Sequence, residues 1–532
     1  MQVVIPMSGF GERFRKVGYD VPKPLIVIDG KPIIQHVVEM FPGEVDFSFI
    51  CNKDHLSEKK YQMNEILKKI APSGKIYSIE PHKLGPVHAV LQIINHLDLE
   101  KPTIVNYADF TCDWNYDDFC KNVLESNCDG AIPSYRGFHP HTIWSNYYAY
   151  VPEINMKAKD IQEKKPFTKN PQDEFASSGT YYFKNASLMH EYFKKSISMD
   201  LAVSGEFYVS MVYKPMIDEG LDIKVYELNH FMQWGTPFDL EEYRYWSNCF
   251  SALINKQAAS SQKGSLILPM VGHGSRFKKE GYDVPKPLIP VSGEPMAVQA
   301  LLDLPRAEKE VFVLRSDMPG IARLKSEIQK KSTNAEFVVL NNMTDGQAST
   351  CEEGSHHLNR DEPVTIAACD NGMIYDNERL TNLLSSEDVD VIVWSVRGYP
   401  GAIRSPEMYG WIDSDESGLI KKVSVKKPLS MPSKDPIIVG AFTFKKLEYF
   451  LKSVQNMKDR EAKINGEYYV DTAINDAISM GLRCVIFEIE HYICWGTPND
   501  LRTFEYWQSC FHGWKSHPYK IEEDNNVHDP IV

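Results

Sequence analysis

Two stretches of the chain carry the same residue types, and those types suit the binding of phosphate. In each stretch an apolar run enters a loop with glycines, and an arginine and a Pro-Lys-Pro sequence follow; the stretches are Val3–Gly30 and Leu266–Gly293. Glycines let the backbone approach a polyphosphate closely, and arginine and lysine supply fixed positive charge. Because the whole set recurs at matching spacing, we interpret both stretches as phosphate-binding loops. The residues concerned are Ser8, Gly9, Gly11, Arg13 and Lys23, then Gly272, Gly274, Ser275, Arg276 and Lys286.

The repetition continues to the end of each half. Lys23 precedes Lys286 by 263 positions, and Asp109 precedes Asp370 by 261. A nearly constant offset across separate motifs indicates two copies of one domain. We therefore predict a first copy at 1–250, a second at 265–515, a linker at 251–264 and a polar tail at 516–532.

Within each copy, short apolar runs alternate with helical patterns. This alternation predicts an α/β fold made of two tandem Rossmann-like, doubly wound, mostly parallel sheets. Expected strands in the first copy are Ser48–Cys51, Lys75–Ile79, Thr103–Asn106 and Gly130–Pro133; expected helices are Ile34–Phe41, Glu58–Ile70, Val87–Leu97 and Tyr116–Glu125. In such sheets ligands bind beyond the carboxyl ends of the strands, where the glycine loop and Asp109 lie.

Composition excludes several classes of function. The net charge of −14 argues against non-specific binding of nucleic acid. No apolar run approaches the roughly 20 residues of a membrane span, and the N-terminus enters a strand without the basic region of a secretory signal. Ten scattered cysteines without a Cys-x-x-Cys pair indicate free thiols in the cytoplasm rather than a zinc site.

Further paired motifs follow the loops. Asp109 and Asp370 end apolar strands, so they are candidate Mg²⁺ ligands, although a strand-end acid can also serve as a turn or helix cap. Each copy then has a Lys-Lys-Pro sequence, a β-rich stretch with one glycine, a Gly-Glu pair and a Gly-Thr-Pro. In those motifs we single out Lys165 and Lys427, Gly179 and Gly440, Glu206 and Glu467, and Gly235 and Gly496.

The ordered set resembles the sugar-phosphate nucleotidyltransferase family, also called nucleoside-diphosphate-sugar pyrophosphorylases. The resemblance covers nearly the whole chain. It implies that a sugar 1-phosphate or a similar phosphomonoester attacks the α-phosphorus of a nucleoside triphosphate and expels pyrophosphate. It implies that the loop arginines hold the triphosphate, that Lys23 and Lys286 support the α-phosphate, and that the strand-end aspartates bind Mg²⁺. Lys165 and Lys427 would hold the acceptor phosphate, and Glu206 and Glu467 its polar body. Gly85 and Gly346 are also expected at the nucleotide site, and Gly179 and Gly440 at the acceptor site.

The chain departs from the family pattern at three places. Gln233 and Cys494 stand where many members have a second metal-binding aspartate. The first copy has Glu12 where the second has Ser275, and a carboxylate beside a triphosphate repels it unless it points away. Ser210 of the first copy corresponds to Asp471 of the second. We therefore expect the second copy to be the more orthodox.

Other conspicuous residues have simpler explanations. His139 and His141, and His356 and His357, are interpreted as isolated surface histidines. The aromatic residues after each Gly-Thr-Pro are expected to pack against the sheet; they are Tyr243, Tyr245, Trp246, Phe504, Tyr506 and Trp507. Asp413-Ser-Asp415 is expected in a hairpin turn.

Three functions remain open at this stage. The leading one is a nucleotidyltransferase that makes an activated building block for a surface polysaccharide, with the two copies packed as a pseudo-dimer. The second is a nucleotide-binding regulatory protein in which one or both copies are inactive. The third is a glycosyltransferase of related fold, which Pro-Lys-Pro behind the glycine loop disfavours.

Overall fold

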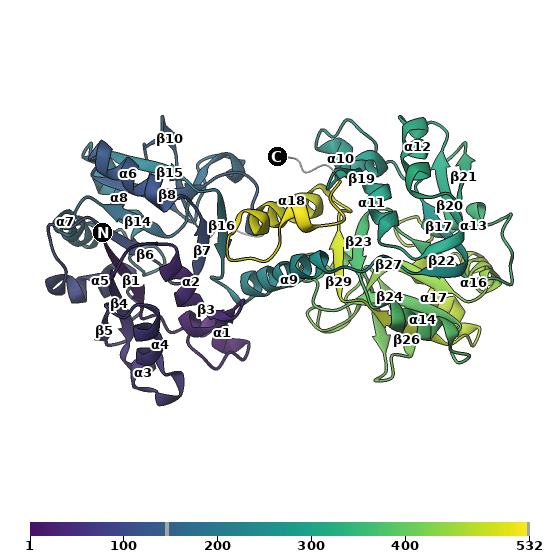
Figure 1. Cartoon of the computed structure of the whole chain (residues 1–532), viewed down its shortest axis with the longest axis horizontal. Coiled ribbons are helices and arrows are strands. Elements are labelled where there is room, and N and C mark those ends of the chain that lie inside the picture. Colours follow the sequence, from purple (N-terminus) through teal and green to yellow (C-terminus); the bar gives the residue numbers. More distant parts are fainter. Residues whose placement is uncertain (144–147, 529–532) are drawn as a thin grey trace. The chain divides into compact units, whose positions relative to one another are not determined.

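The computed structural model describes residues 1–143 and 148–528, and the chain divides into two compact units, Met1–Arg244 and Tyr245–Val532. Each unit is built on one large sheet with helices packed along it (Figure 1). The strand order is β15-β8-β14-β6-β1-β4-β5 in the first unit and β28-β24-β27-β22-β17-β20-β21 in the second. If the strands of each unit are numbered along the chain, the same numbers stand in the same order across both sheets. The two units therefore have the same topology.

The main strands of the first unit are β1 (Gln2–Met7), β4 (Asp46–Asn52), β5 (Lys75–Ile79), β6 (Thr103–Asn106), β8 (Gly130–Tyr135), β14 (Thr180–Phe183) and β15 (Ile223–Glu227). Those of the second are β17 (Ser261–Pro269), β20 (Arg306–Arg315), β21 (Ala335–Leu340), β22 (Val364–Ala367), β24 (Val391–Val396), β27 (Ile437–Phe444) and β28 (Cys484–Glu488). Neighbouring strands run parallel except at β14 and β27, each of which is antiparallel to both of its neighbours. The predicted fold class is confirmed.

The helices of the first unit are α1 (Glu12–Lys16), α2 (Ile33–Glu39), α3 (Lys53–Ser57), α4 (Met63–Ile70), α5 (Pro86–Ile93), α6 (Tyr116–Ser126), α7 (Ala186–Ser198) and α8 (Tyr213–Asp218). Helix α9 (Pro237–Ile254) begins in the first unit and ends in the second. The second unit continues with α10 (Ser275–Lys279), α11 (Met296–Leu302), α12 (Ile321–Lys331), α13 (Gln347–Gly354), α14 (Asn377–Ser385), α15 (Pro400–Arg404), α16 (Leu447–Asp459), α17 (Val470–Ser479) and α18 (Pro498–Gly513).

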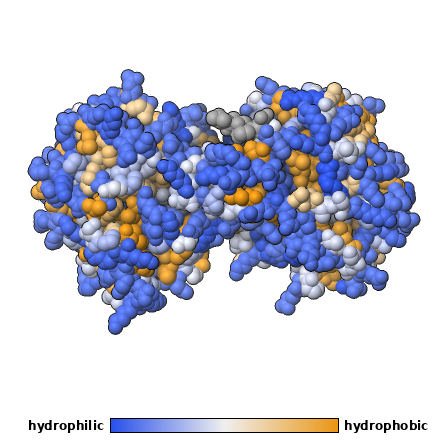
Figure 2. All heavy atoms as spheres, viewed as in Figure 1, coloured by the Kyte–Doolittle hydropathy of each residue, from blue (hydrophilic) through white to orange (hydrophobic). Residues whose placement is uncertain are grey.

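Both faces of the first sheet are buried at its central strand β1, which explains why this strand is apolar without alternation. Val4 in β1 packs into a core cluster with residues of α5, α7 and α8. Val3 and Ile5, which point to the opposite face, are also fully buried. The visible surface is in contrast mostly hydrophilic, with small scattered apolar patches (Figure 2). No helix in the described part of the chain is long and apolar enough to cross a membrane.

Two element predictions were wrong in detail. The helix expected at Glu58–Ile70 is a 3₁₀ turn (Lys59–Tyr61) followed by α4, because Gln62 between them takes a left-handed conformation with φ of 48°. The β-rich stretch that contains Gly179, Ser177–Phe183, is interrupted at this glycine, so that it belongs to two strands, β13 (Phe175–Ser177) and β14, and not to one. The predicted Asp413–Asp415 hairpin is present, between β25 (Gly410–Ser414) and β26 (Ile420–Val425).

The ends of the two expected non-domain segments are ordered. Residues 251–254 belong to α9 and residues 261–264 to β17, and the Asn377 side chain bonds to the backbone of Ala258 and Ser260. In the stretch from Ser516, expected as a polar tail, Tyr519 is fully buried and its hydroxyl donates to Asp524 over 2.9 Å. The buried aromatic ring thus anchors a stretch whose composition is polar. Residues 529–532 lie outside the described part.

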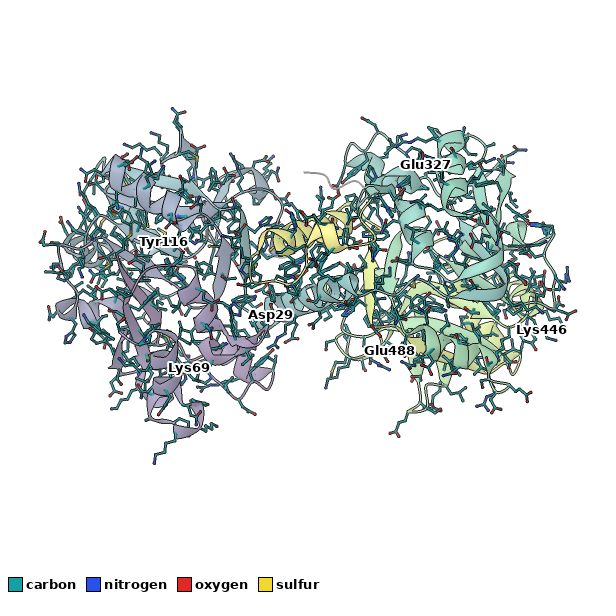
Figure 3. All side chains as sticks on the ribbon, viewed as in Figure 1. Asp29, Lys69, Tyr116, Glu327, Lys446 and Glu488 are labelled. Carbon is teal, nitrogen blue, oxygen red and sulfur yellow. The ribbon has the colours of Figure 1, made fainter. Side chains whose placement is uncertain are left out.

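The two histidine pairs behave differently. His139 and His141 are buried, not on the surface as expected, because their rings pack with Tyr135 and Phe231. His356 and His357 are exposed and lie beside glutamates. Of the six aromatic residues after Gly-Thr-Pro, Tyr243, Trp246, Phe504 and Trp507 are buried, and Tyr245 and Tyr506 are half-buried. Another aromatic anchor is Tyr116 (Figure 3), whose buried ring lies at the start of α6 and whose hydroxyl donates to Glu44 over 2.7 Å.

Candidate active site

A glycine loop follows the first strand of each sheet and ends at a residue in the left-handed region. Gly11, with φ of 65°, precedes α1, and Gly274, with φ of 62°, precedes α10. A Cβ at Gly274 would lie 2.9 Å from the Cβ of Lys286. Glycine is therefore needed here both for the backbone angle and for the close approach of the lysine segment.

The lysine of Pro-Lys-Pro pairs with the strand-end aspartate in both units. In the first unit Lys23 Nζ lies 2.6 Å from Asp109 Oδ2 and donates to the carbonyl of Gly235 over 3.3 Å. In the second unit Lys286 contacts Asp370 in the same way and donates to the carbonyl of Gly496 over 3.0 Å. Three motifs that are far apart in the sequence thus meet at one place in each unit.

A two-stranded ribbon brings the aspartate and the Gly-Thr-Pro together. In the first unit β7 (Phe110–Asp113) pairs with β16 (His230–Gln233), and Trp234 N donates to Asp109 O over 2.8 Å. In the second unit β23 (Asn371–Ile374) pairs with β29 (His491–Cys494) and the equivalent bond runs to Asp370. Burial disfavours the charge of Lys286, but the Asp370 carboxylate outweighs this effect, so the pKa of Lys286 lies above its usual value.

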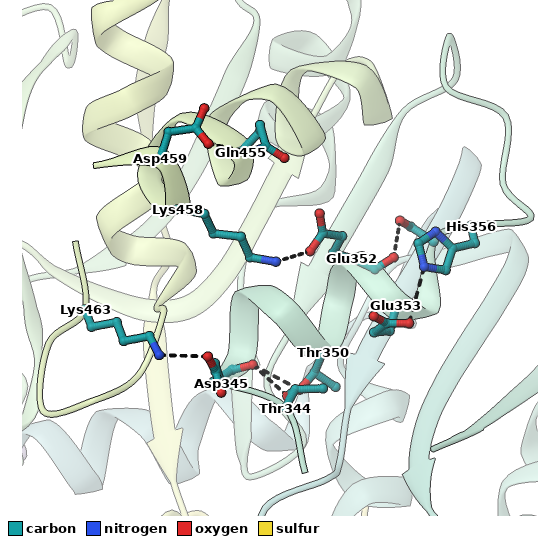
Figure 4. A network of polar contacts seen from close by, with 12 residues as sticks. Thr344, Asp345, Thr350, Glu352, Glu353, His356, Gln455, Lys458, Asp459 and Lys463 are labelled. Atoms are coloured by element: carbon teal, nitrogen blue, oxygen red, sulfur yellow. Dashed lines mark hydrogen bonds and ion pairs between the residues drawn. The ribbon is translucent and has the colours of Figure 1, made fainter. Parts of the chain in front are cut away.

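A second wall forms where the loop before α5 or α13 meets the Gly-Glu motif. Gly85 has φ of 90°, and a Cβ there would lie 2.7 Å from the backbone N of Phe207. Gly346 has φ of 121°, and a Cβ there would lie 2.6 Å from the backbone N of Tyr468. In the second unit side chains also tie these loops together, since Lys463 pairs with the neighbouring Asp345 over 2.7 Å (Figure 4). The predicted nucleotide-site glycines are thus held against the segments that carry Glu206 and Glu467.

The Gly-Glu motifs belong to a cluster of charged and tyrosine side chains. Burial, and then a hydrogen bond with Glu206, raise the pKa of Tyr208, and the positive charge of Arg13 partly opposes them. Burial and Glu467 likewise raise the pKa of Tyr469 to about 12, against the charge of Arg276. The loop arginine and the glutamate therefore face the same tyrosine in each unit.

The lysine in this cluster is not the one singled out from the sequence. Lys165 and Lys427 are exposed. The lysine before each of them contacts the tyrosine: Lys164 Nζ donates to the Tyr208 hydroxyl over 2.9 Å, and Lys426 Nζ lies 5.0 Å from the centre of the Tyr469 ring. Lys164 and Lys426 have φ of 60° and 58°, and this left-handed turn directs two consecutive lysines differently.

The residues in place of a second metal-binding aspartate bond to a helix-capping aspartate instead. Burial raises the pKa of Asp239 to about 6, against hydrogen bonds from Thr236 and Gln233. In the second unit the Cys494 thiol lies 3.6 Å from Asp500 Oδ2. Among the described residues no group of three or more His, Cys, Asp or Glu could hold a metal. The donor set at each site is one strand-end carboxylate, which fits a hard cation whose other ligands are phosphate oxygens and water.

The added carboxylate of the first loop is neutralised locally. Glu12 pairs with Lys83 over 2.7 Å, and Lys83 lies in the loop before Gly85. The second unit has Ser275 and Thr344 at these positions. The repulsion considered for Glu12 is thus offset by a lysine present only in the same copy. Both side chains are more than half exposed, so the pair contributes little to stability.

Comparison with known proteins supports the resemblance seen in the motifs. Residues 2–206 match the family model described as nucleotidyl transferase, a span that includes the glycine loop, the Lys23–Asp109 pair and Glu206. Residues 2–206 belong to the nucleotidyl transferase family. This segment is referred to below as the nucleotidyl transferase segment.

Each of three similar proteins aligns with about half of the chain. The bifunctional protein GlmU of Methanococcus aeolicus is 24% identical over 286 residues, covering 53% of this chain and 62% of that protein. The GlmU of Methanocaldococcus jannaschii is 25% identical over 244 residues, covering 46% of this chain and 53% of that protein. The chain thus spans little more than half the length of these relatives. A solved nucleoside-diphosphate-sugar pyrophosphorylase from Vibrio cholerae RC9 is 20% identical with a TM-score of 0.37, over 46% of this chain and 99% of that chain.

Sequence reasoning missed three side chains of the nucleotidyl transferase segment, Lys83, Glu163 and Lys164, and it also missed Tyr208, which lies just after that segment. For Tyr208 a signal was available, because Tyr469 repeats it two positions after the glutamate. For Lys83 and Glu163 none was, since the second copy has other residue types at both places.

Proposed function

We propose that the chain is a cytoplasmic nucleotidyltransferase that joins a nucleoside triphosphate to a sugar 1-phosphate or a similar phosphomonoester and releases pyrophosphate. The observation that carries the proposal is the repeated geometry of the two units. Each has a glycine loop, a lysine that pairs with the strand-end aspartate, and a cluster of arginine, lysine, tyrosine and glutamate opposite. The ten free cysteines agree with a reducing compartment.

The reaction needs cations in place before the phosphates meet. Bringing a triphosphate up to a second phosphate crowds roughly six negative charges. Phosphoryl-type transfer depends mainly on positioning and on charge stabilisation. An oxygen of the acceptor phosphate attacks the α-phosphorus, and the bond to the departing pyrophosphate breaks with its electron pair. No nucleophilic side chain is needed for this exchange.

The side chains have distinct parts in this mechanism. Arg13 and Arg276 hold the triphosphate above the glycine loop. Lys23 and Lys286, oriented by the strand-end carboxylates, place an ammonium group at the α-phosphate. Glu206 and Glu467 bind hydroxyl groups of the acceptor.

The acceptor phosphate is bound by the Lys-Lys-Pro segments. Lys164 and Lys426 lie in the cluster in the present geometry, and Lys165 and Lys427 are free to turn toward the phosphate from outside. Mg²⁺ held by Asp109 or Asp370 would neutralise part of the triphosphate charge. The product would be an activated building block for a surface polysaccharide.

The test is pyrophosphate release by the full chain from a panel of nucleoside triphosphates and sugar 1-phosphates. We expect release from at least one pair, and loss of about tenfold or more in the variant Lys23→Ala/Lys286→Ala, because each change removes a positive charge that stabilises the transition state. The control is Lys53→Ala/Lys446→Ala, which removes two exposed lysines paired elsewhere (Lys446 is labelled in Figure 3).

Two results would overturn the proposal. If the Lys23→Ala/Lys286→Ala variant released pyrophosphate at the wild-type rate, the reaction would take place at another site. No release from any pair, with nucleotide still bound, would identify a nucleotide-binding regulatory protein instead.

A further inference from the structure

Each unit has a short pair of strands next to the cluster of lysine, tyrosine and glutamate described above. This strand pair allows the two units to be aligned residue by residue. In the first unit β12 (Gln162–Glu163) pairs with β9 (Ala149–Val151), and Glu163 lies opposite Ala149. In the second unit β26 pairs with β25, and Val425 lies opposite Gly410. Because both pairs precede the lysine of the cluster, Glu163 corresponds to Val425 and Ala149 to Gly410.

In the first unit a carboxyl group comes from the strand. Glu163 Oε2 accepts a hydrogen bond from the Ser210 hydroxyl over 2.6 Å. Burial raises the pKa of Glu163, and the hydrogen bond from Ser210 and the charge of Lys164 lower it in part. The negative charge of this carboxyl thus acts on the lysine that contacts Tyr208, and Glu163 directly precedes that lysine in the chain.

In the second unit the strand offers only Val425, and a carboxyl group comes from the helix instead. Asp471, at the position of Ser210, lies in the first turn of α17. Burial raises its pKa to about 6, and the charge of Lys426 opposes this. The negative charge of this carboxyl thus also acts on the lysine that contacts the tyrosine of the Gly-Glu motif.

The residue opposite the strand position, Ala149 in the first unit and Gly410 in the second, also has to change when the carboxyl moves from strand to helix. A Cβ at Gly410 would lie 2.3 Å from Asp471 Oδ2, so any larger residue there would collide with the carboxylate. Ala149 fits in the first unit because Ser210 is small. Each unit thus has three residues that fit together: Ala149, Glu163 and Ser210 in the first, and Gly410, Val425 and Asp471 in the second. A combination of residues from both units would cause a collision, or would place two carboxyl groups or none at the site.

We propose that Glu163 and Asp471 are the same functional group supplied from opposite walls of the acceptor pocket, and that each is a positioning residue for the lysine beside it. This rests on the proposed function for the identity of the substrate, a phosphomonoester. The carboxyl orients Lys164 or Lys426 between the tyrosine ring and the acceptor phosphate. Moving the carboxyl from helix to strand should therefore preserve its action.

The experiment relocates the carboxyl within the second copy of the full chain, with the first copy silenced by Lys23→Ala. Asp471→Ser alone should raise KM for the acceptor about tenfold and leave KM for the nucleotide unchanged, since only the lysine is released. Adding Val425→Glu and Gly410→Ala should bring KM back to within about threefold of its starting value. Asp459→Ser, at an exposed aspartate of α16 (Figure 4), is the control for loss of a surface charge.

A second readout does not depend on turnover. Lysines carrying ¹³C-methyl groups, with the Lys426 signal assigned through Lys426→Arg, report the charge beside them. The signal should move as pH crosses about 6, where Asp471 titrates. Tyr469, with a pKa near 12, stays protonated there. The step should vanish in Asp471→Ser and return in the relocated variant.

The outcomes separate the two proposals. A lysine step that behaves as expected in a chain that releases no pyrophosphate would refute the proposed function and support the carboxyl equivalence. An unchanged acceptor KM in Asp471→Ser, or a relocated variant that keeps its thermal unfolding temperature but recovers neither KM nor the lysine step, would overturn the equivalence.

Discussion

Two glycines of the second unit that are predicted at the nucleotide site differ in how tightly the fold constrains them. Gly346 has φ of 121° and no room for a Cβ against the backbone of Tyr468. Gly272 has an ordinary φ, and a Cβ there would meet nothing within 4 Å. The fold therefore requires glycine at position 346, whereas at position 272 it leaves room for a side chain or, under the proposed function, for a phosphate.

Alanine at each position should therefore give opposite results. Gly346→Ala should lower the thermal unfolding temperature by about 4 °C or more, because both strain and collision destabilise the folded loop. Gly272→Ala should leave that temperature unchanged and weaken nucleotide binding, because the methyl group fills space meant for phosphate. Differential scanning calorimetry and titration calorimetry measure the two effects. A stable Gly346→Ala protein, or a Gly272→Ala protein with full affinity, would contradict this assignment.

Lys23, Asp109 and their equivalents in the second unit were singled out because the same two residue types recur at nearly the same offset. The structure brings the lysine and the aspartate into contact in each unit. Glu163 could not be predicted from the sequence, because its meaning depends on Ser210, 47 positions later, and on a strand register that only the folded chain defines. Lys164 was missed because the choice between two adjacent lysines rests on a backbone angle.

At the scale of elements, the start of α9 shows how a buried acid reports on the fold. Asp239 Oδ2 accepts from the backbone N of Thr236 over 3.1 Å and from its hydroxyl, while Asp239 N donates back to that hydroxyl. This reciprocal cap lies beside Gly235, whose carbonyl accepts from Lys23. The cap thus holds a wall of the candidate site in place.

The cap predicts a dependence of stability on pH. The pKa of Asp239 is about 6 when folded and 3.8 in the reference state. The folded state therefore binds the extra proton between these values, and stability falls as pH rises from about 4 to about 6, by about 3 kcal/mol at most. Asp239→Asn cannot lose a proton, so its unfolding temperature relative to wild type should rise between pH 4 and pH 7.

Calorimetry of both proteins across that range measures the difference. Thr236→Val is the matched variant, since it keeps the acid and removes a hydroxyl that bonds to it. A constant difference between wild type and Asp239→Asn would show that Asp239 is ionised throughout.

At the scale of the whole molecule, the two units share a topology but line their pockets differently. Phe110 packs under Gly179 in the first unit, whereas Asn371 in the second donates to the carbonyl of Val439 over 3.2 Å. Pro86 corresponds to Gln347, and the buried carboxyl comes from opposite walls. Such changes alter ligand preference more readily than fold.

The copies should accordingly differ in substrate or rate. In full chains, Lys23→Ala should leave the profile of the second copy and Lys286→Ala that of the first, each measured by pyrophosphate release over the same panel. The two variants should favour different acceptors or differ in rate by about tenfold. Identical profiles and rates would mean that the duplication serves assembly alone.

Such experiments need the intact chain because α9 begins in the first unit and ends in the second. From Tyr245 onward this helix belongs to the second unit, where Trp246 and Phe250 are buried and Phe250 stacks on Phe504. A cut near Ser261 would leave these side chains on the wrong fragment. The second fragment would lose part of its own core.

A tyrosine of α9 also occupies backbone hydrogen-bonding groups of strand β29. The Tyr245 hydroxyl accepts from the amide of Tyr492 and donates to its carbonyl, both over 2.8 Å, at the middle of β29. A fragment that begins after Ile254 would present that amide and carbonyl without a partner, on a strand next to apolar residues. Open strand edges of this kind recruit other chains. We therefore expect a fragment that begins after Ile254 to self-associate. In the intact chain Tyr245 prevents this by occupying the amide and the carbonyl of Tyr492.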